Sequence, residues 1–124
     1  MVKLPIKVRM AIKGGKPFSL ATSSKKGKPN VVYVGYLKLI DAETVLIADN
    51  YFKKTKNNLL QNNQMAFSVL DEKSGSYQIK GRVQYLTKGK YYDEMQKWCD
   101  KKHPRKAAVI LHVKEVYNGA KKIR

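Results

Sequence analysis

Six segments of this chain have the composition and length of β-strands, and most loops between them are short enough to be hairpin turns. The segments are rich in β-branched and aromatic residues and cover residues 17–23, 29–40, 44–48, 65–70, 76–87 and 107–117. One short helical pattern lies between the third and fourth segments. Successive parallel strands would each need a long crossover connection, whereas antiparallel strands can be joined by tight turns. The sequence therefore predicts a mainly β fold, a six-stranded antiparallel barrel with short helices packed outside.

Three short helices are predicted beside these strands. Apolar spacing favours one helix over Pro5–Lys13, a second just after Thr55, and a third over Tyr91–Lys102. Gly35 lies inside one predicted strand, which is typical of a β-bulge or of a close approach to the backbone, and Gly81 breaks another predicted strand. With 124 residues and no repeat, linker or low-complexity segment, the chain is predicted to form one domain over residues 1–124.

The chain is strongly basic, with a formal net charge of +17 from 26 Lys and Arg residues against nine Asp and Glu residues. This charge favours an anionic partner, such as a nucleotide, a nucleic acid or a membrane surface. However, 22 of the 26 are Lys, and they are spread along the chain, which is more typical of a solvated surface than of base recognition by Arg. There is no apolar run of membrane-spanning length and no signal peptide, so a cytoplasmic protein without a membrane partner is expected.

Several common catalytic and metal-binding patterns are missing from the sequence. His103 lies near a predicted helix end and His112 lies within a strand, and neither has an evident catalytic partner. The single cysteine, Cys99, excludes an internal disulfide and is expected to be a small buried residue. No metal-ligand spacing and no glycine-rich phosphate loop occur. The sequence therefore predicts no metal site, and His112 is interpreted as a half-buried strand residue.

One stretch does combine features of a ligand site. A buried strand ends at the polar pair Asp49 and Asn50, and a helical pattern begins shortly afterwards around Lys53, Lys54 and Thr55. Free N–H groups and the helix dipole make such a helix start a suitable place for a phosphate. The alternative is that Thr55 is simply an N-cap and the lysines are solvated.

The neighbouring strand supplies aromatic side chains for the same site. If it lies beside the strand that ends at Asp49, then Tyr33 and Tyr36 form an aromatic wall next to the phosphate position. A slot of this kind suits a planar heteroaromatic ligand with a phosphate tail. The residues alone therefore predict a nucleotide or flavin mononucleotide (FMN) site.

Three segments of the sequence, taken together, resemble a known family. They are GKPNVVYVGYLK, then VLIADNYFKKTKNNLLQNNQMAFSV with its pattern Lys54-Thr55-x-x-Asn58-Leu59-x-x-Asn62, and QIKGRVQYL around Gly81. In this order they resemble the FMN-binding split-barrel proteins typified by pyridoxamine-phosphate oxidase, especially their small single-domain relatives. The resemblance covers about residues 18–117 and implies a split β-barrel that forms a homodimer with FMN at the subunit interface.

The resemblance also implies which residues would hold FMN. The family's phosphate contacts correspond to Lys54 and Thr55, assisted by Lys53. Its contacts with the flavin ring correspond to two strand segments, and segments of the partner subunit near Gln78, Pro104 and the C-terminal tail would close the pocket. The ring-contacting positions are Val32, Tyr33, Val34, Ala48, Asp49 and Asn50.

Two departures from the oxidases argue against activity on pyridoxamine phosphate. The oxidases carry a phosphate-binding Arg shortly after the strand proline, where this chain is apolar near Val32, and they have a longer basic C-terminal part. The expected function is therefore electron transfer or a small flavin-dependent oxidoreductase, with a redox partner or a small molecule as its reaction partner.

Three other interpretations remain open from the sequence. F420 or haem could occupy the same slot in place of FMN, or the chain could be a structural dimer that has lost its cofactor. The chain could instead be a basic β-barrel that binds nucleic acid through its lysines and through stacking on Tyr33, Tyr36, Tyr77 and Tyr85.

Overall fold

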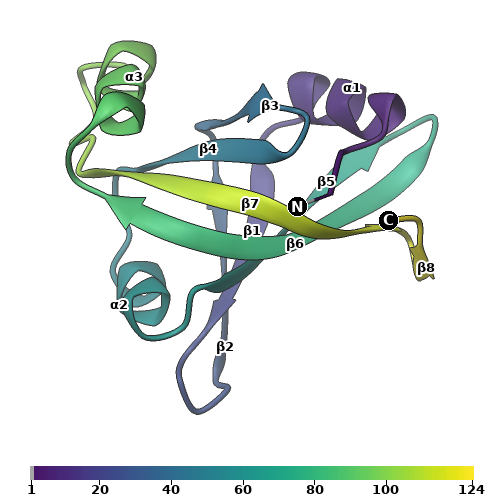
Figure 1. Cartoon of the computed structure of the whole chain (residues 1–124), viewed down its shortest axis with the longest axis horizontal. Helices are drawn as coiled ribbons and strands as arrows, with labels where there is room; N and C mark the ends of the chain where they lie inside the picture. Colours follow the sequence, from purple (N-terminus) through teal and green to yellow (C-terminus); the bar gives the residue numbers. More distant parts are fainter. Residues whose placement is uncertain (1) are drawn as a thin grey trace.

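A computed structural model describes residues 2–124 of the chain (Figure 1). It contains three short helices and eight strands. In chain order they are α1 (Ile6–Gly14), β1 (Phe18–Ser23), β2 (Pro29–Val34), β3 (Leu37–Asp41), β4 (Thr44–Asp49), α2 (Lys54–Gln61), β5 (Gln64–Asp71), β6 (Gly75–Leu86), α3 (Lys90–Trp98), β7 (Ala107–Asn118) and β8 (Lys121–Lys122).

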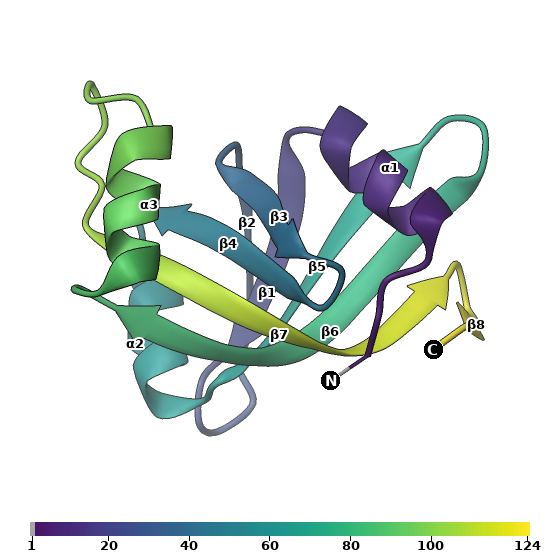
Figure 2. The same ribbon diagram turned by 45° about the horizontal axis from the view of Figure 1, so that its top comes forward.

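All the strands belong to one antiparallel sheet, in the order β2-β1-β5-β6-β7-β4-β3, with β8 paired to β7. The sheet curls on itself, so that β1 and β2 cross behind β4, β6 and β7 (Figures 1 and 2). Its two edges, β2 and β3, are consecutive in the chain but are not paired with each other. This is the predicted antiparallel split barrel.

The main hydrophobic core fills the inside of the curled sheet. Helix α1 lies over one end of it, as Figure 2 shows, and contributes Leu4 from its preceding segment together with Val8 and Ile12. A second, smaller cluster lies between α3 and the outer face of the sheet, with Met95 and Cys99 against Leu46 and Ile110. Burial of Cys99 agrees with the sequence prediction.

Strand β4 is buried along its whole length because both of its faces are covered. Val45 and Ile47 point into the main core, whereas Leu46 and Ala48 pack toward α3. The continuous apolar run therefore has a physical cause, since a half-exposed strand would alternate between apolar and polar residues. The end of β4, at Asp49, is consequently held in place by packing on both faces of the strand.

The prediction of six strands was wrong in two details. The predicted strand over residues 29–40 is two strands, because the chain leaves β1 after Val34 and joins β4 at Leu37. At the break, the Tyr36 carbonyl accepts a hydrogen bond from the Ala48 N–H at 3.1 Å. The polar C-terminal tail adds the second extra strand, β8. An unbroken apolar pattern does not reveal that its two halves pair with different strands.

The two strand glycines have different roles. The register between β6 and β7 shifts at Gly81, and a Cβ there would overlap the carbonyl oxygen of His112 and lie 2.9 Å from the carbonyl carbon. Strand β6 therefore continues through Gly81 with a bulge in its pairing, where the sequence predicted a break. At Gly35 a Cβ would have no other atom within 4 Å, so no close approach occurs there, and this glycine marks the break between β2 and β3.

The predicted helix boundaries also need correction. The first helix begins at Ile6 rather than Pro5, and α3 ends at Trp98 rather than Lys102 because Cys99 is already extended. Residues 99–106 then form a loop that returns to β7. Across residues 2–124, no helix has the length and apolar character needed to span a membrane.

Candidate functional site

A cavity of about 460 Å³ opens where β2, the end of β4, the start of α2 and the 99–106 loop meet. Its volume lies within the range of small-molecule and cofactor sites. The residues that line it are Val32, Tyr33, Val34, Gly35, Tyr36, Ala48, Asn50, Tyr51, Phe52, Lys53, Lys54, Thr55 and His103.

One wall of the cavity is apolar and aromatic. Val34, Ala48 and Phe52 are buried, whereas Tyr33 and Tyr51 are 78% and 68% exposed. Because β2 is an edge strand, the backbone groups along its outer side have no partner strand. This wall can therefore offer both apolar contact and backbone hydrogen bonds to a flat ligand.

The opposite part of the cavity is the N-terminus of α2. The helix begins at Lys54, and its N-cap residue, Lys53, makes no side-chain capping bond. Thr55 is buried inside the first turn, so the interpretation of Thr55 as the N-cap is wrong. Uncapped N–H groups beside two exposed lysines give this end of the helix a positive potential.

A buried polar network fixes where α2 starts. The Thr22 hydroxyl accepts hydrogen bonds from the side-chain amides of Asn30 (3.2 Å) and Asn58 (3.0 Å), and the Asn30 amide also donates to the Thr55 hydroxyl at 3.0 Å. One turn later, the Asn62 amide donates to the Ser23 hydroxyl. The asparagines of the sequence pattern, Asn58 and Asn62, thus attach α2 to β1, and Asn30 attaches it to β2.

The 99–106 loop is held against the cavity by hydrogen bonds to the end of β4. The Arg105 N–H donates to the Asn50 side-chain oxygen at 2.9 Å, and the Lys106 N–H donates to the Asp49 carbonyl oxygen at 2.8 Å. The Tyr36 hydroxyl accepts a further bond from the Asp100 N–H at 3.3 Å. These bonds place His103 in the cavity lining.

Asp49 itself lies behind the cavity and does not line it. Its carboxylate is completely buried and accepts hydrogen bonds from the Phe52 N–H and from the Tyr85 hydroxyl. Burial, and secondly the hydrogen bond to this carboxylate, raise the pKa of Tyr85 well above its ordinary value. The Asp49 carboxylate therefore supports the turn between β4 and α2, and the predicted contact of Asp49 with a ring stays a prediction.

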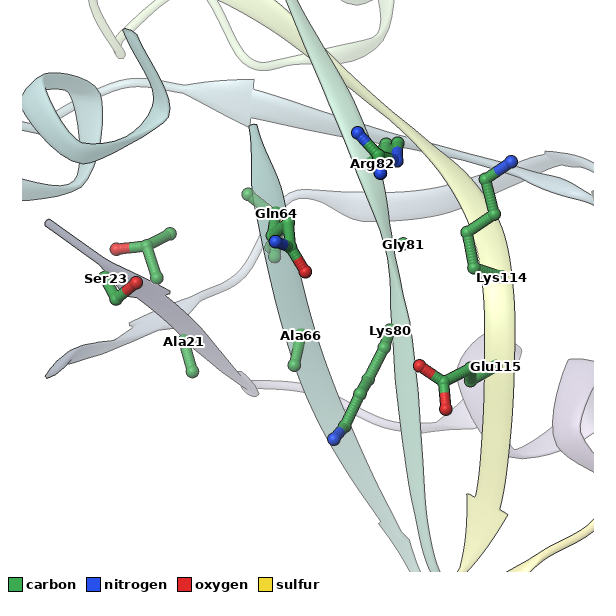
Figure 3. A pocket seen from close by; sticks show the side chains of 11 residues that line it. Ala21, Ser23, Gln64, Ala66, Lys80, Gly81, Arg82, Lys114 and Glu115 are labelled. Carbon is green, nitrogen blue, oxygen red and sulfur yellow. The ribbon is translucent and has the colours of Figure 1, made fainter. Parts of the chain in front are cut away.

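A second hollow, here called the groove, lies across the face of the sheet formed by β1, β5, β6 and β7 (Figure 3). It has a volume of about 500 Å³, and small residues such as Ala21, Ala66 and Gly81 contribute to its lining. Its polar side chains are those of Thr22, Ser23, Gln64, Lys80, Arg82, Lys114 and Glu115. Within residues 2–124, neither hollow contains a cluster of three or more His, Cys, Asp or Glu side chains suited to a metal ion.

The model of the family described as pyridoxamine 5'-phosphate oxidase matches residues 4–118. The chain belongs to this family. It is also 38% identical, over 104 residues, to an uncharacterized protein of Methanocaldococcus jannaschii, and the match covers 80% of this chain and 70% of that protein. The family predicted from the three sequence segments is thus confirmed.

Solved structures share the fold of this pyridoxamine 5'-phosphate oxidase-family protein. HupZ of Group A Streptococcus has a TM-score of 0.83 at 25% identity, covering 95% of this chain and 94% of HupZ. An FMN-binding protein of Syntrophomonas wolfei has a TM-score of 0.70 at 21% identity, covering 90% and 82%. An F420 reductase and the heme storage protein HutZ of Vibrio cholerae also have this fold, with TM-scores of 0.71 and 0.68 at 16% and 12% identity.

The cavity of this family member brings together most of the residues predicted to bind a cofactor. Asp49 and Gln78 are the predicted residues that do not line it, and the other eight do, namely Val32, Tyr33, Val34, Ala48, Asn50, Lys53, Lys54 and Thr55. Gln78 lies on β6, away from the cavity lining. Sequence reasoning missed Tyr51, Phe52 and His103 as lining residues, and a ligand role for any of these residues stays a prediction.

Proposed function

We propose that this chain binds FMN, with the flavin ring in the cavity and the phosphate at the start of α2. The observation that carries the proposal is the meeting, in one cavity of about 460 Å³, of an apolar and aromatic wall with an uncapped, lysine-flanked helix N-terminus. The wall suits a flat heteroaromatic ring, and the helix start suits a dianion. The FMN-binding protein of Syntrophomonas wolfei, which has the same fold, adds support.

The roles of individual residues follow from their positions. Lys53 and Lys54 would neutralise the phosphate charge, and the Thr55 hydroxyl, which already accepts a bond from Asn30, can donate its own proton. Val32, Val34 and Ala48 would contact the ring. Bound FMN would supply the redox chemistry of an electron-transfer protein or a small oxidoreductase, and the chain would bind and orient it.

A homodimer is part of the same proposal. The outward-facing side chains of edge strand β2 include Val31 and Tyr33, which are 66% and 78% exposed. Gln78 lies outside the cavity, so only a second copy could bring it to the bound ring. Light scattering during gel filtration would measure the mass, and a monomer both with and without FMN would contradict this part of the proposal.

The full or partial burial of three of the four predicted stacking tyrosines weakens the nucleic-acid alternative. Stacking of bases requires exposed aromatic faces, but Tyr77 is completely buried in the main core and Tyr36 and Tyr85 are half-buried. Only Tyr33, among the four tyrosines on which that alternative depended, is exposed. F420 and haem remain the rival ligands, because an F420 reductase and a heme storage protein have the same fold.

The decisive experiment compares FMN with riboflavin, which has the same ring without the phosphate, and with the rival ligands F420 and haemin. The visible spectrum of the purified protein is recorded before and after FMN is added and excess ligand is removed, and the same is done with riboflavin, F420 and haemin. We expect FMN to be retained and riboflavin to bind more weakly, because riboflavin lacks the phosphate. Equal affinity for FMN and riboflavin, or an unchanged FMN affinity in Lys54→Ala, would contradict the phosphate assignment. Retention of haemin or F420 but not FMN would overturn the proposal.

A further inference from the structure

His103 is a polar side chain fixed within the lining of the cavity. Its Nδ1 lies 3.1 Å from the Tyr51 hydroxyl oxygen. Its ring also makes edge-to-face contacts with Tyr36 and Tyr51, at centroid distances of 5.5 and 5.8 Å. Three side-chain contacts thus restrict the imidazole to one orientation.

The loop that carries His103 is restrained on both sides of it. Before it, the Asp100 N–H donates to the Tyr36 hydroxyl, and after it, the Arg105 N–H donates to the Asn50 side chain. The Gln96 side-chain amide donates to the Arg105 carbonyl at 2.7 Å, and the Arg105 guanidinium donates back to the Gln96 carbonyl at 2.8 Å. Hydrogen-bonding groups that are preorganised in this way can select a ligand without a further ordering cost.

One nitrogen of this imidazole is left for a ligand. Within the described part of the chain, the His103 Nε2 has no hydrogen-bond partner, whereas Nδ1 is paired with Tyr51. When the Tyr51 hydroxyl donates to Nδ1, the neutral imidazole carries its proton on Nε2 and is a donor there. Val34 and Phe52, which also line the cavity, have no donor, and the Asn50 side-chain amide in the same lining already donates to the Cys99 sulfur.

We propose that His103, positioned by Tyr51, is the side chain that recognises the polar edge of the ring bound in this cavity. The inference rests on the proposed function, since it assumes that the ring of FMN lies there. The physical argument concerns the selectivity of the cavity for its ligand. An apolar wall accepts any flat ring of suitable size, whereas a fixed donor discriminates against a ring that lacks a matching acceptor.

The experiment uses FMN and riboflavin, which share the ring and differ in the phosphate. Quenching of flavin fluorescence gives the Kd of each ligand for the wild type, His103→Phe and Lys54→Ala. Phe keeps the aromatic contacts of His103 but has no ring nitrogen. We expect His103→Phe to raise the Kd of both ligands by the same factor, about tenfold, as for the loss of one hydrogen bond. Lys54→Ala should raise the Kd of FMN alone.

Further variants separate recognition from folding. His103→Gln, whose amide can reach a similar position to Nε2, should regain part of the affinity, and Tyr51→Phe should weaken both flavins less than His103→Phe does. His112→Asn is the matched control, because His112 is the chain's other histidine and its Nε2 pairs with Gln84 on the sheet. In NMR spectra with the two histidine rings labelled, FMN should shift the His103 ring signals and leave those of His112 in place.

The outcomes distinguish the two proposals. Unchanged Kd values for both flavins in His103→Phe, or a loss confined to FMN, would overturn the role of His103 while leaving flavin binding intact. A wild-type protein that binds neither flavin would overturn the proposed function and the inference with it. A thermal melt of each variant identifies any loss of affinity that comes from unfolding.

Discussion

The cavity and the groove have nearly the same volume but differ in how their polar groups are held. In the cavity, polar groups come from the ends of elements, where a helix N-terminus, a loop and an edge strand have hydrogen-bonding capacity left over. In the groove, they come from paired strands, whose backbone groups bond to each other. Long side chains such as Lys80 and Lys114 supply its charge.

This difference teaches that volume alone does not identify a binding site. The cavity residues Thr55, Asn50 and His103 each have a hydrogen-bonded partner that fixes their position. The lysines of the groove would each lose side-chain entropy on binding a ligand. We therefore expect ligand binding to depend on the cavity, and the groove floor to matter for stability.

The largest expected effect is on stability and lies in the groove. Gly81→Ala places a methyl group against the His112 backbone carbonyl, so β6 and β7 must separate locally. We expect a loss of more than about 3 kcal/mol in the free energy of unfolding, measured by urea denaturation. The matched control is Gly35→Ala in the cavity lining, where a Cβ meets no other atom within 4 Å. Equal stability of the two variants would contradict the assigned role of Gly81.

The second effect concerns the support behind the cavity. Asp49→Ala removes the buried acceptor of the Phe52 N–H and the Tyr85 hydroxyl, so two donors lose their partner. We expect a loss of about 2–3 kcal/mol in unfolding free energy. Glu115→Gln, at an exposed carboxylate of the groove, should change it by less than about 0.5 kcal/mol. Thermal unfolding of both variants tests this, and a stable Asp49→Ala protein would show that the turn after β4 does not depend on the carboxylate.

The sequence was sufficient for the parts of the molecule that depend on local pattern. The antiparallel barrel followed from strand-like segments with hairpin-length loops, and the helix start near Lys54 followed from its neighbours along the chain. Gly81 was also singled out as an interruption of a long strand pattern, although the bulge there depends on the pairing with β7.

The parts that depend on distant residues could not be predicted. The resemblance assigned Asp49 to the ring, and no local pattern showed that Tyr85, 36 residues later, would hold its carboxylate in the interior. His103 had no evident partner in the sequence, because its contacts with Tyr36 and Tyr51 arise only when the 99–106 loop folds back onto β4. A local pattern contains no information on which of two neighbouring segments a polar side chain will bond.

The third effect compares equal charge changes in the two hollows. The double variants Lys53→Ala/Lys54→Ala and Lys80→Ala/Lys114→Ala each remove two positive charges, so any effect of the net charge of +17 is the same. We expect the cavity variant to raise the Kd of FMN about tenfold and the groove variant to change it less than about twofold. Equal effects in both variants would mean that the overall field, rather than the start of α2, attracts the phosphate.

The smallest expected effect is in the titration of two tyrosines. Burial, then the bond to Asp49, raise the pKa of Tyr85 behind the cavity, and the bond to Glu115 raises the pKa of Tyr117 beside the groove. A tyrosine with a raised folded-state pKa contributes stability below its unfolded pKa of about 10, and that contribution is lost as the pH rises further. The stability difference between the wild type and Tyr85→Phe should therefore shrink above about pH 10.

Absorbance at a wavelength where ionised tyrosine absorbs follows the ionisation of the same two tyrosines directly. Tyr85→Phe should remove a late-ionising group from the titration curve, whereas Tyr117→Phe should remove a smaller delay. The reason is that Tyr85 is partly desolvated, whereas the Tyr117 hydroxyl bonds to a carboxylate at the surface. If the two variants titrate alike, burial behind the cavity has no more effect on a polar group than the open surface beside the groove. The contrast between a preorganised cavity and a solvated groove would then not hold for these two tyrosines.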